Sequence, residues 1–550
     1  MTATSMTGGE AVARSLHAHG VDTVFGIPGV HNLALYDALC DIPGMTHIVA
    51  RHEQGAAFMA DGYARVSGRV GVCVTTSGPA VLNTVTSLGT AYCDSSPVLC
   101  ITSQIPKDAI GLEKGFVHEC RDQLGCLRPV ACWCERAETV ESIPELLRAA
   151  FLRMRKGRPR PAVLEIPCDV LDGKGDVEIP TPGDVHRKRP SDQELDRAVE
   201  LLRAAKRPLI WAGGGVIASD ASDELRRLAE QTQAPVLTTV LGKGAIPGDH
   251  PLAAGNVALV PVAREYVASC DVMLAVGTRF TDEEADRWTL RLPKTLIHID
   301  IDPEEIDRNY PATLGLVGDA RESLGALVER VTGVDLESRA TNRAEEVAAL
   351  RKSILEYCSQ PTPDGVQLVE TLRDALPRQT VVVSDLTIAA YWCRRLLDVY
   401  EPHTNVYPWG FCTLGFGVPA GVGAKAAQPN RPVVVISGDG GFLFNCQELA
   451  IAAQFDLPIV VVIFNDSGYG VLRRQQEVIY GRTIAAELMN PDFVTLARSF
   501  NVDACRVSSL GELGTAVAGA IASGRTSVIE AVVPIPWQAM DPSAEVFAAK

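Results

Sequence analysis

The sequence lacks the features of a nucleic-acid-binding, membrane-spanning or disordered chain. Its 550 residues carry a formal net charge of −16, whereas binding to a nucleic-acid backbone requires concentrated lysine and arginine. No apolar run reaches the length of a membrane span, and the chain does not begin with a basic and apolar secretory signal. Apolar residues make up 47% and charged residues 21%, a globular balance. We therefore expect a cytoplasmic protein with no nucleic-acid or membrane partner.

Zinc motifs are also missing, although the chain has fifteen cysteines. The densest group, Cys120 to Cys134, contains no C-x-x-C pair and no suitably spaced histidine follows it, which disfavours a zinc site. Ala56 stands where a zinc protease of the H-E-x-x-H type would have its second histidine. We expect the cysteines to act mainly as small buried apolar residues in a reducing compartment.

The order of the apolar runs predicts three domains, because 550 residues exceed the usual size of one core. Short runs rich in valine and isoleucine alternate with helix-length segments in residues 1–172, 191–345 and 361–535. This alternation predicts an α/β fold with three doubly wound parallel-sheet domains. Residues 172–192 are expected to be a linker, and residues 338–360 a polar helix.

The strands of these domains are expected where the apolar runs are densest. They lie near residues 21–27, 46–50, 70–76, 97–103, 161–167, 207–214, 234–239, 272–277, 295–302, 380–385, 432–438, 457–465 and 527–534.

Two acidic turns follow neighbouring apolar runs in the third stretch. Gly438-Asp439-Gly440-Gly441 follows one run, and Asn465-Asp466 follows the next. If the two strands are adjacent, the carboxylates meet beyond their carboxyl ends, where ligands of open parallel sheets bind. Carboxylate and carbonyl oxygens suit Mg²⁺, and glycines let backbone N–H groups approach a phosphate. The alternative is that Gly-Asp-Gly is only a tight turn.

This pair of turns resembles the cofactor motif of the thiamine diphosphate-dependent enzyme superfamily. The resemblance implies that Mg²⁺ is bound by Asp439, Asp466 and the backbone carbonyl of Gly468. It also assigns Gly438, Gly440, Gly441 and Tyr469 to contacts with the cofactor. The family more often has asparagine at the position of Asp466, so the strength of cation binding is left open.

Residues 50–68, ARHEQGAAFMADGYARVSG, are similar to a second segment of the same superfamily. The similarity implies that Glu53 hydrogen-bonds the aminopyrimidine ring of the cofactor and promotes loss of the thiazolium C2 proton. The alternative is a glutamate that only favours a helix N-terminus.

Residues 411–429, FCTLGFGVPAGVGAKAAQP, resemble the element that holds this cofactor in a bent shape. Leu414 would support the bend, and the backbones of Cys412 and Leu414 would contact the pyrimidine. Alternatively, the segment is only a glycine-rich packing site. Residues 384–392 resemble the turn that offers Thr387 to the diphosphate.

The resemblance covers nearly the whole chain and is closest to the acetolactate synthase-like branch. It implies pyrimidine-binding, central and diphosphate-binding domains, with Glu53 of one subunit facing the Asp439 turn of another. At least a homodimer, and on the family pattern a homotetramer, is therefore expected. The implied reaction is decarboxylation of a small 2-oxo acid, giving an enamine that is protonated or transferred to an acceptor carbonyl. An oxidase or lyase that uses the same cofactor stays open.

The residues of the substrate side leave the substrate open. His31 and His118 are candidate catalytic residues, and Glu119 stands where simple pyruvate decarboxylases have a second adjacent histidine. Leu472 replaces their later glutamate, and Gln475 replaces a tryptophan of biosynthetic acetohydroxyacid synthases. These differences count against a simple pyruvate decarboxylase and against a biosynthetic acetohydroxyacid synthase.

Two alternatives remain for the function. Residues 26–39, residues 51–56 and the His118-Glu119 pair resemble decarboxylases of 5-guanidino-2-oxopentanoate, whose cationic end could pair with Glu119. An equal alternative is that Glu119 is an ordinary surface carboxylate. Arg473 and Arg474 could attract the carboxylate of a substrate. The commoner alternative is that they are two ordinary exposed arginines. A non-catalytic scaffold is the alternative of another class, but Glu53 and both metal carboxylates are present.

FAD is disfavoured as an additional cofactor. Gly213, Gly215 and Ala218 fit a loose dinucleotide fingerprint, but no acidic residue ends the next predicted strand, residues 234–239. In this superfamily the central domain binds FAD in some members only.

Overall fold

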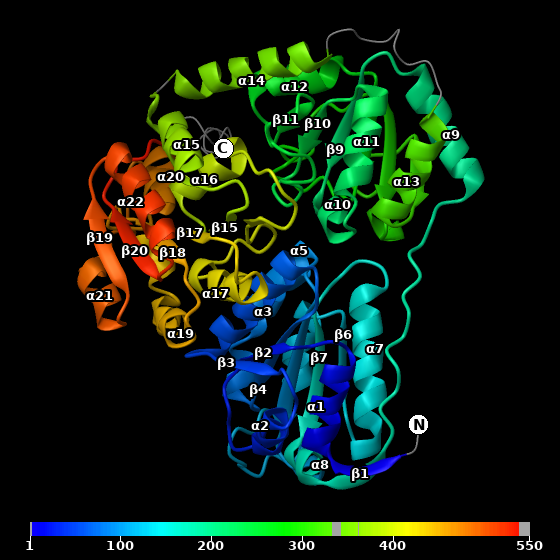
Figure 1. Cartoon of the computed structure of the whole chain (residues 1–550), viewed down its shortest axis with the longest axis vertical. Helices are drawn as coiled ribbons and strands as arrows, with labels where there is room; N and C mark the ends of the chain where they lie inside the picture. The colour runs from blue at the N-terminus through cyan, green and yellow to red at the C-terminus, as the bar shows by residue number, and fades with distance from the viewer. Residues whose placement is uncertain (1–2, 333–342, 361, 538–550) are drawn as a thin grey trace.

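Three α/β units, each built on a six-stranded parallel sheet, make up the computed structural model (Figure 1). It describes residues 3–332, 343–360 and 362–537. The three sheets lie within the three stretches expected from the sequence, and the predicted fold class is confirmed. The first part of the predicted polar helix, residues 338–342, lies outside the described residues, and the helix α14 (Arg343–Ser359) forms the remainder.

The N-terminal sheet has the strand order β3-β2-β4-β5-β7-β6. Its central strands are buried on both faces, because helices cover the apolar runs from either side. The strands are β2 (Thr23–Gly26), β3 (Thr46–Val49), β4 (Gly71–Thr75), β5 (Val98–Gln104), β6 (Trp133–Arg136) and β7 (Ala162–Pro167). The helices are α1 (Gly8–Ala18), α2 (Leu33–Cys40), α3 (Glu53–Ser67), α4 (Pro79–Leu82), α5 (Val85–Asp94), α6 (Gln123–Leu127), α7 (Ile143–Arg155) and α8 (Cys168–Asp172).

The central sheet has the order β11-β10-β9-β12-β13-β14. Its strands are β9 (Pro208–Ala212), β10 (Val236–Thr238), β11 (Ala253–Gly255), β12 (Val272–Val276), β13 (Thr295–Asp300) and β14 (Leu314–Val317). Its helices are α9 (Asp192–Ala204), α10 (Gly214–Ala218), α11 (Ser222–Thr232), α12 (Pro261–Ser269) and α13 (Ala320–Val331).

The C-terminal sheet has the order β16-β15-β17-β18-β20-β19. Its strands are β15 (Val381–Ser384), β16 (Asn405–Val406), β17 (Val433–Gly438), β18 (Val460–Phe464), β19 (Asp503–Val507) and β20 (Ser527–Ala531). Its helices are α15 (Asp364–Ala375), α16 (Ile388–Leu396), α17 (Gly417–Ala427), α18 (Asp439–Phe442), α19 (Leu449–Gln454), α20 (Gly470–Tyr480), α21 (Phe493–Ser499) and α22 (Leu510–Ser523).

The strands that sequence analysis did not predict are mostly sheet edges. β6, β11, β14, β16 and β19 each lie at the end of a sheet. An edge strand has a partner on one side only and is short or partly exposed, so it lacks a dense apolar run. The linker prediction was also incomplete, because residues 174–177 form β8 (Lys174–Val177), which pairs antiparallel with β1 (Thr4–Thr7).

The N-terminal and C-terminal units meet through α3 and α17, which lie side by side in the centre of Figure 1. A Cβ atom at Gly62 would lie 2.2 Å from the carbonyl oxygen of Ala420, and one at Gly423 would lie 1.9 Å from that of Met59. The two backbones therefore approach as closely as glycine allows. None of the helices in the described ranges has both the length and the apolar character that crossing a membrane requires.

Candidate active site

The two acidic turns meet at one edge of the C-terminal sheet. β17 and β18 are hydrogen-bonded neighbours, with Gly438 paired to Phe464. Asp439 begins α18 directly after β17, and Asn465-Asp466 follows β18. The adjacency that the sequence argument required is therefore present.

Asp439 is held inside this edge with 2% of its surface exposed. Its Oδ2 accepts the backbone N–H of Gly468 at 3.0 Å and the side-chain amide of Asn490 at 2.6 Å. Asn490 also donates to Asn465 Oδ1, so it joins both turns. Sequence analysis missed Asn490, because it comes from a later segment that folds back against Gly468 and carries no motif of its own.

Asp466 is more exposed and pairs with a cation. Arg473 donates to its Oδ2 at 3.0 Å. Burial and the neighbouring charge of Asp439 raise the pKa of Asp466, whereas Arg473 opposes the rise. A Cβ atom at Gly470 would lie 1.8 Å from this carboxylate, so only glycine lets it lie against the start of α20. Arg473 is thus not an open anchor for a substrate carboxylate.

Glu53 is the first residue of α3 and is half-buried. Its Oε2 accepts from Asn83 Nδ2 at 2.9 Å. In the described part of the chain no hydrogen bond or ion pair joins Glu53 to Asp439 or Asp466. The hydrogen-bond partner of Glu53 is therefore Asn83 of the same unit.

His31 and His118 come together from two loops of the N-terminal unit. Their rings meet edge to face with centroids 5.6 Å apart, and His31 Nδ1 lies 2.7 Å from Ser77 Oγ. Burial, and secondarily the neighbouring His118, lower the pKa of His31. His118 has a φ of 63°, and Gly78 packs on its carbonyl so closely that a Cβ atom would lie 2.4 Å away.

Glu119 has one satisfied and one unsatisfied oxygen. Its Oε2 accepts the backbone N–H groups of Gly115 and Phe116 at 2.6 and 3.0 Å. Its Oε1 is buried and has no hydrogen-bond partner. A buried carboxylate oxygen without a donor favours a cationic or N–H-bearing ligand.

Three sequence models of one family match this chain in consecutive blocks. Residues 6–126 match the thiamine pyrophosphate enzyme N-terminal TPP-binding domain, residues 195–327 its central domain, and residues 385–531 its C-terminal TPP-binding domain. The chain belongs to the thiamine pyrophosphate enzyme family. This family membership confirms the resemblance to acetolactate synthase-like enzymes and the assignment of thiamine diphosphate as the cofactor of the family.

Similar proteins extend over nearly the full chain. A "probable acetolactate synthase large subunit" from Methanocaldococcus jannaschii is 38% identical over 547 residues, covering 96% of this chain and 92% of that protein. A "probable 2-ketoarginine decarboxylase" from Pseudomonas aeruginosa is 40% identical over 514 residues, 92% of this chain and 91% of that protein. The acetolactate synthase isozyme 3 large subunit of Escherichia coli is 33% identical over 542 residues, covering 95% of this chain and 93% of that protein.

The donors at the sheet edge fit the cation expected beside thiamine diphosphate. Two carboxylates and a backbone carbonyl are hard oxygen ligands, and their mutual repulsion would be relieved by a divalent ion. The side-chain oxygen of Asn490 is buried there without a partner. Residues 3–332, 343–360 and 362–537 hold no metal-like group of three or more His, Cys, Asp or Glu, so the ion would depend on this smaller donor set and on cofactor oxygens.

The glycines of the first turn form a cradle with no room for side chains. A Cβ atom at Gly440 would lie 2.7 Å from the ring of Tyr469. One at Gly438 would lie 3.2 Å from Thr387, and one at Gly441 would lie 3.3 Å from Asp385. The fold therefore brings Thr387 and Tyr469, both predicted to contact the cofactor, against the glycines of this turn.

Asp385 is a site residue whose side chain sequence analysis did not use. It directly follows β15, just as Asp439 directly follows β17, and this shared position was the available signal. Its Oδ2 accepts the N–H groups of Gly415 and Gly417, each at 3.2 Å, and burial raises its pKa to about 6. Asp385 thereby fixes the turn that follows Leu414.

The predicted pyrimidine element lies at the junction of the N- and C-terminal units. Leu414 is half-buried, and Cys412 has a φ of 49° with Sγ 3.0 Å from the carbonyl of Trp409. Asp94 of α5 accepts the N–H groups of Trp409 and Gly410 at 3.0 and 2.6 Å. The start of this element is thus held by the N-terminal unit.

The remaining substrate-side residues lie on α20, which has no buried residue. Leu472 is 50% exposed. Arg474 pairs with Glu477 at 3.2 Å, and Gln475 is half-buried. Among the described residues no hydrogen bond or ring contact joins these side chains to His31 or His118.

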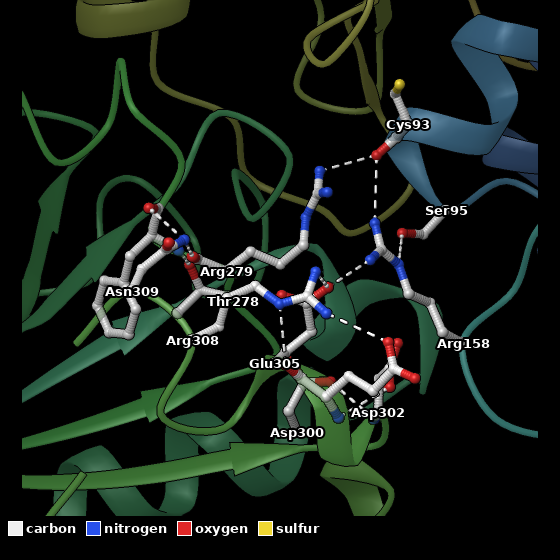
Figure 2. Close-up of polar contacts among 12 residues, drawn as sticks. Cys93, Ser95, Arg158, Thr278, Arg279, Asp300, Asp302, Glu305, Arg308 and Asn309 are labelled. Atoms are coloured by element: carbon white, nitrogen blue, oxygen red, sulfur yellow. Dashed lines mark hydrogen bonds and ion pairs between the residues drawn. The ribbon is translucent and has the colours of Figure 1, made fainter. Parts of the chain in front are cut away.

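A cavity of about 920 Å³ lies between the N-terminal and central units. Figure 2 shows two arginines that span it: Arg158 donates to Glu305 at 2.7 Å, and Arg279 donates to the carbonyl of Cys93 at 2.8 Å. Asp300, at the end of β13, is buried there, and burial raises its pKa to about 7.

A cavity of this size lies in the range of small-molecule and cofactor sites. Sequence analysis sought an acidic residue at the end of β10, whereas the structure supplies one from β13. Gly213 and Gly215 pack on Gly277, where Cβ atoms would lie 2.0 and 2.6 Å from backbone atoms, so helix packing alone requires them. The glycine spacing therefore says nothing for or against FAD.

Proposed function

We propose that this chain catalyses the thiamine diphosphate- and Mg²⁺-dependent decarboxylation of a 2-oxo acid. The observation that carries the proposal is the meeting of Asp439 and Asp466 beside a glycine cradle, in a chain of this family. The product is an aldehyde if a proton completes the reaction, which makes the enzyme a lyase. The product is a hydroxy-ketone if an acceptor carbonyl completes the reaction, which makes the enzyme a transferase.

The residues of the C-terminal unit bind and orient the cofactor. Asp439, Asp466 and the carbonyl of Gly468 would hold Mg²⁺, and the glycine N–H groups would face the diphosphate. Leu414 would support the bend between the two rings. When bound, thiamine diphosphate supplies a carbon nucleophile that attacks the 2-oxo group and accepts the electrons released with CO₂.

The residues of the N-terminal unit move protons. Glu53 exchanges a proton with the aminopyrimidine ring, and Asn83 holds its carboxylate in place. His31 is uncharged near neutral pH, because its pKa is lowered. Together with His118 and Ser77 it is placed to deliver a proton to the product. This cluster favours the aldehyde over the hydroxy-ketone as the main product.

A basic 2-oxo acid such as 5-guanidino-2-oxopentanoate is the favoured substrate candidate. The printed name of the Pseudomonas relative supports this choice, and so does the unpartnered Oε1 of Glu119. A guanidinium group would satisfy that oxygen with a charge-assisted hydrogen bond.

The active site is proposed to be completed by a second copy of the chain, in a homodimer or a homotetramer. Within the described residues no hydrogen bond joins Glu53 to the Asp439 turn, and its partner is Asn83. Large apolar side chains are exposed next to both halves of the site, namely Val30, Phe116, Val117, Phe444, Leu472 and Met489. Location in the cytoplasm stays a prediction.

FAD takes no part in the proposed reaction, which is redox-neutral. If it binds, Arg158, Arg279 and Asp300 would hold it. Flavin absorbance of the purified protein measures this directly.

The test incubates the purified protein with Mg²⁺, thiamine diphosphate and a panel of neutral, acidic and basic 2-oxo acids. CO₂, aldehyde, hydroxy-ketone and oxygen consumption are measured. We expect CO₂ release that is lost in Glu53→Gln. A protein that releases no CO₂ from any member would support the non-catalytic alternative, and a Glu53→Gln variant as fast as the wild type would refute the proposed activation.

A further inference from the structure

Glu448 is a buried carboxyl group that no step of the proposed mechanism uses. It ends the 3-10 helix η5 (Cys446–Glu448), in the segment that follows Asp439 in the C-terminal unit. Its surface is 0% exposed. A fully buried carboxyl group requires hydrogen-bond donors. The neighbouring Gln447 is one donor, and the backbone donors come from the N-terminal unit.

The backbone donors are the N–H groups that lead into α3. The N–H of Arg51 lies 3.3 Å from Oε1 and 3.2 Å from Oε2 of Glu448. Burial raises the pKa of Glu448 to about 7, and hydrogen bonds from the N–H groups of Arg51 and His52 oppose this rise. A Cβ atom at Gly55 would lie 2.5 Å from Oε1, so the carboxyl group rests on the first turn of α3.

A second contact strengthens the same attachment. The guanidinium of Arg51 donates to Gln454 Oε1 in α19 at 2.6 Å. Residues 51–55 are therefore held by the C-terminal unit through the backbone, through a glycine contact and through a side chain. Glu53 lies in the middle of this segment, and the direction of its side chain depends on how the helix start is held.

We propose that Glu448 is a positioning residue that holds the start of α3 so that the carboxylate of Glu53 reaches the aminopyrimidine ring. This inference rests on the proposed function. In the proposed dimer, Glu53 serves the active site of the other copy. The segment that contains Glu448 follows the Asp439 turn of one active site. Through its contact with α3, Glu448 would then position Glu53, which transfers the proton in the other active site.

The test compares Glu448→Ala and Glu448→Gln in the full chain with two measurements. The first is amide hydrogen exchange of residues 48–56 in the protein without cofactor. The second is the exchange rate of the C2 proton of bound thiamine diphosphate, together with the affinity for the cofactor.

In Glu448→Ala we expect faster amide exchange in this segment and C2 exchange slowed about tenfold or more, since small misplacements reduce proton transfer strongly. Cofactor affinity should change little, because Glu448 does not line the diphosphate cradle. Glu448→Gln keeps one acceptor oxygen and should give a smaller effect in both measurements.

Glu284→Gln is a matched control. Glu284 is 7% exposed and accepts the N–H of Val240 at 2.8 Å, but it lies in the central unit. Burial raises its pKa to about 7, as for Glu448. This variant should lose similar stability without slowing C2 exchange. Glu53→Gln should slow C2 exchange about 100-fold or more.

Wild-type C2 exchange in Glu448→Ala would overturn the proposal, and so would slowed C2 exchange with unchanged amide exchange in residues 48–56. If Glu448→Ala does not fold, the same two measurements on Glu448→Gln test the proposal, with the same outcomes for and against it. Wild-type exchange in Glu53→Gln would instead overturn the proposed function, so the two failures can be told apart.

Discussion

The imidazole rings of His31 and His118 meet edge to face, with centroids 5.6 Å apart, and Ser77 Oγ lies 2.7 Å from His31 Nδ1. Burial and the neighbouring ring favour the neutral form of His31. A neutral His31 imidazole beside a hydroxyl group can pass a proton without building up charge.

Removing His118 should raise the pKa of His31, because one source of the lowering is lost. The acid limb of the pH profile of kcat/KM should therefore move to higher pH in His118→Ala. His31→Ala should lower kcat about 100-fold and increase the ratio of hydroxy-ketone to aldehyde. Steady-state kinetics and product analysis check both effects, and an unmoved acid limb would remove His31 from the proton route.

The two metal carboxylates should differ in their effect on cation binding. Asp439→Asn should abolish activation by Mg²⁺, because the buried carboxylate also accepts from Gly468 and Asn490. Either asparagine keeps one oxygen ligand, but Asp466 is exposed and pairs with Arg473, so Asp466→Asn should weaken Mg²⁺ binding only about tenfold. Calorimetric titration of Mg²⁺ with thiamine diphosphate present measures both affinities. Equal losses in the two variants would contradict the assignment.

Glu119→Gln should discriminate between classes of substrate. Loss of its charge should lower kcat/KM for 5-guanidino-2-oxopentanoate about tenfold or more and leave a neutral 2-oxo acid of similar length nearly unchanged. Competition between the two acids measures the ratio. If both rates fall together, Glu119 supports the loop at Gly115 and Phe116 and does not select the substrate.

The buried ion pair between Arg65 and Asp94 should stabilise the contact between the N- and C-terminal units. Arg65 donates to Asp94 at 3.0 Å and to the carbonyl of Tyr407 at 2.9 Å. Asp94→Ala should lower the free energy of unfolding by about 3–5 kcal/mol, because it leaves buried donors unpaired. The control is Arg69→Ala, whose exposed pair with Asp22 should contribute less than about 1 kcal/mol. Urea unfolding measures both changes, and equal changes would contradict the prediction.

The buried carboxyl of Asp385 should make stability depend on pH. Its folded pKa is raised to about 6, so the folded state holds this proton more tightly than the unfolded chain does. The resulting stability is fully present below the unfolded value of about 4 and is lost as the pH rises through 6. Asp385→Asn cannot titrate and should lack this contribution, which falls by about 1 kcal/mol between pH 5 and pH 7 in the wild type. Denaturant unfolding at the two pH values, compared with the wild type, checks this. A wild-type pH dependence in the variant would contradict it.

The sequence alone determined the α/β class, the central strands and the positions of the acidic turns. Buried parallel strands appear as continuous apolar runs, and a glycine turn with a carboxylate is a local pattern. Because parallel strands place their carboxyl ends at one edge, the sequence predicted that Asp439 and Asp466 converge if their strands are adjacent, and the structure supplied that adjacency.

Only the tertiary structure decided the edge strands, the place of Asn490 and the contacts of Asp385, Glu119 and Glu448. Edge strands are half-exposed and so lack a dense apolar run. The other residues act through contacts with segments distant in the chain, and no local pattern encodes the distance between such segments. A single asparagine or glutamate becomes part of a site only when folding removes it from water and gives it one set of partners.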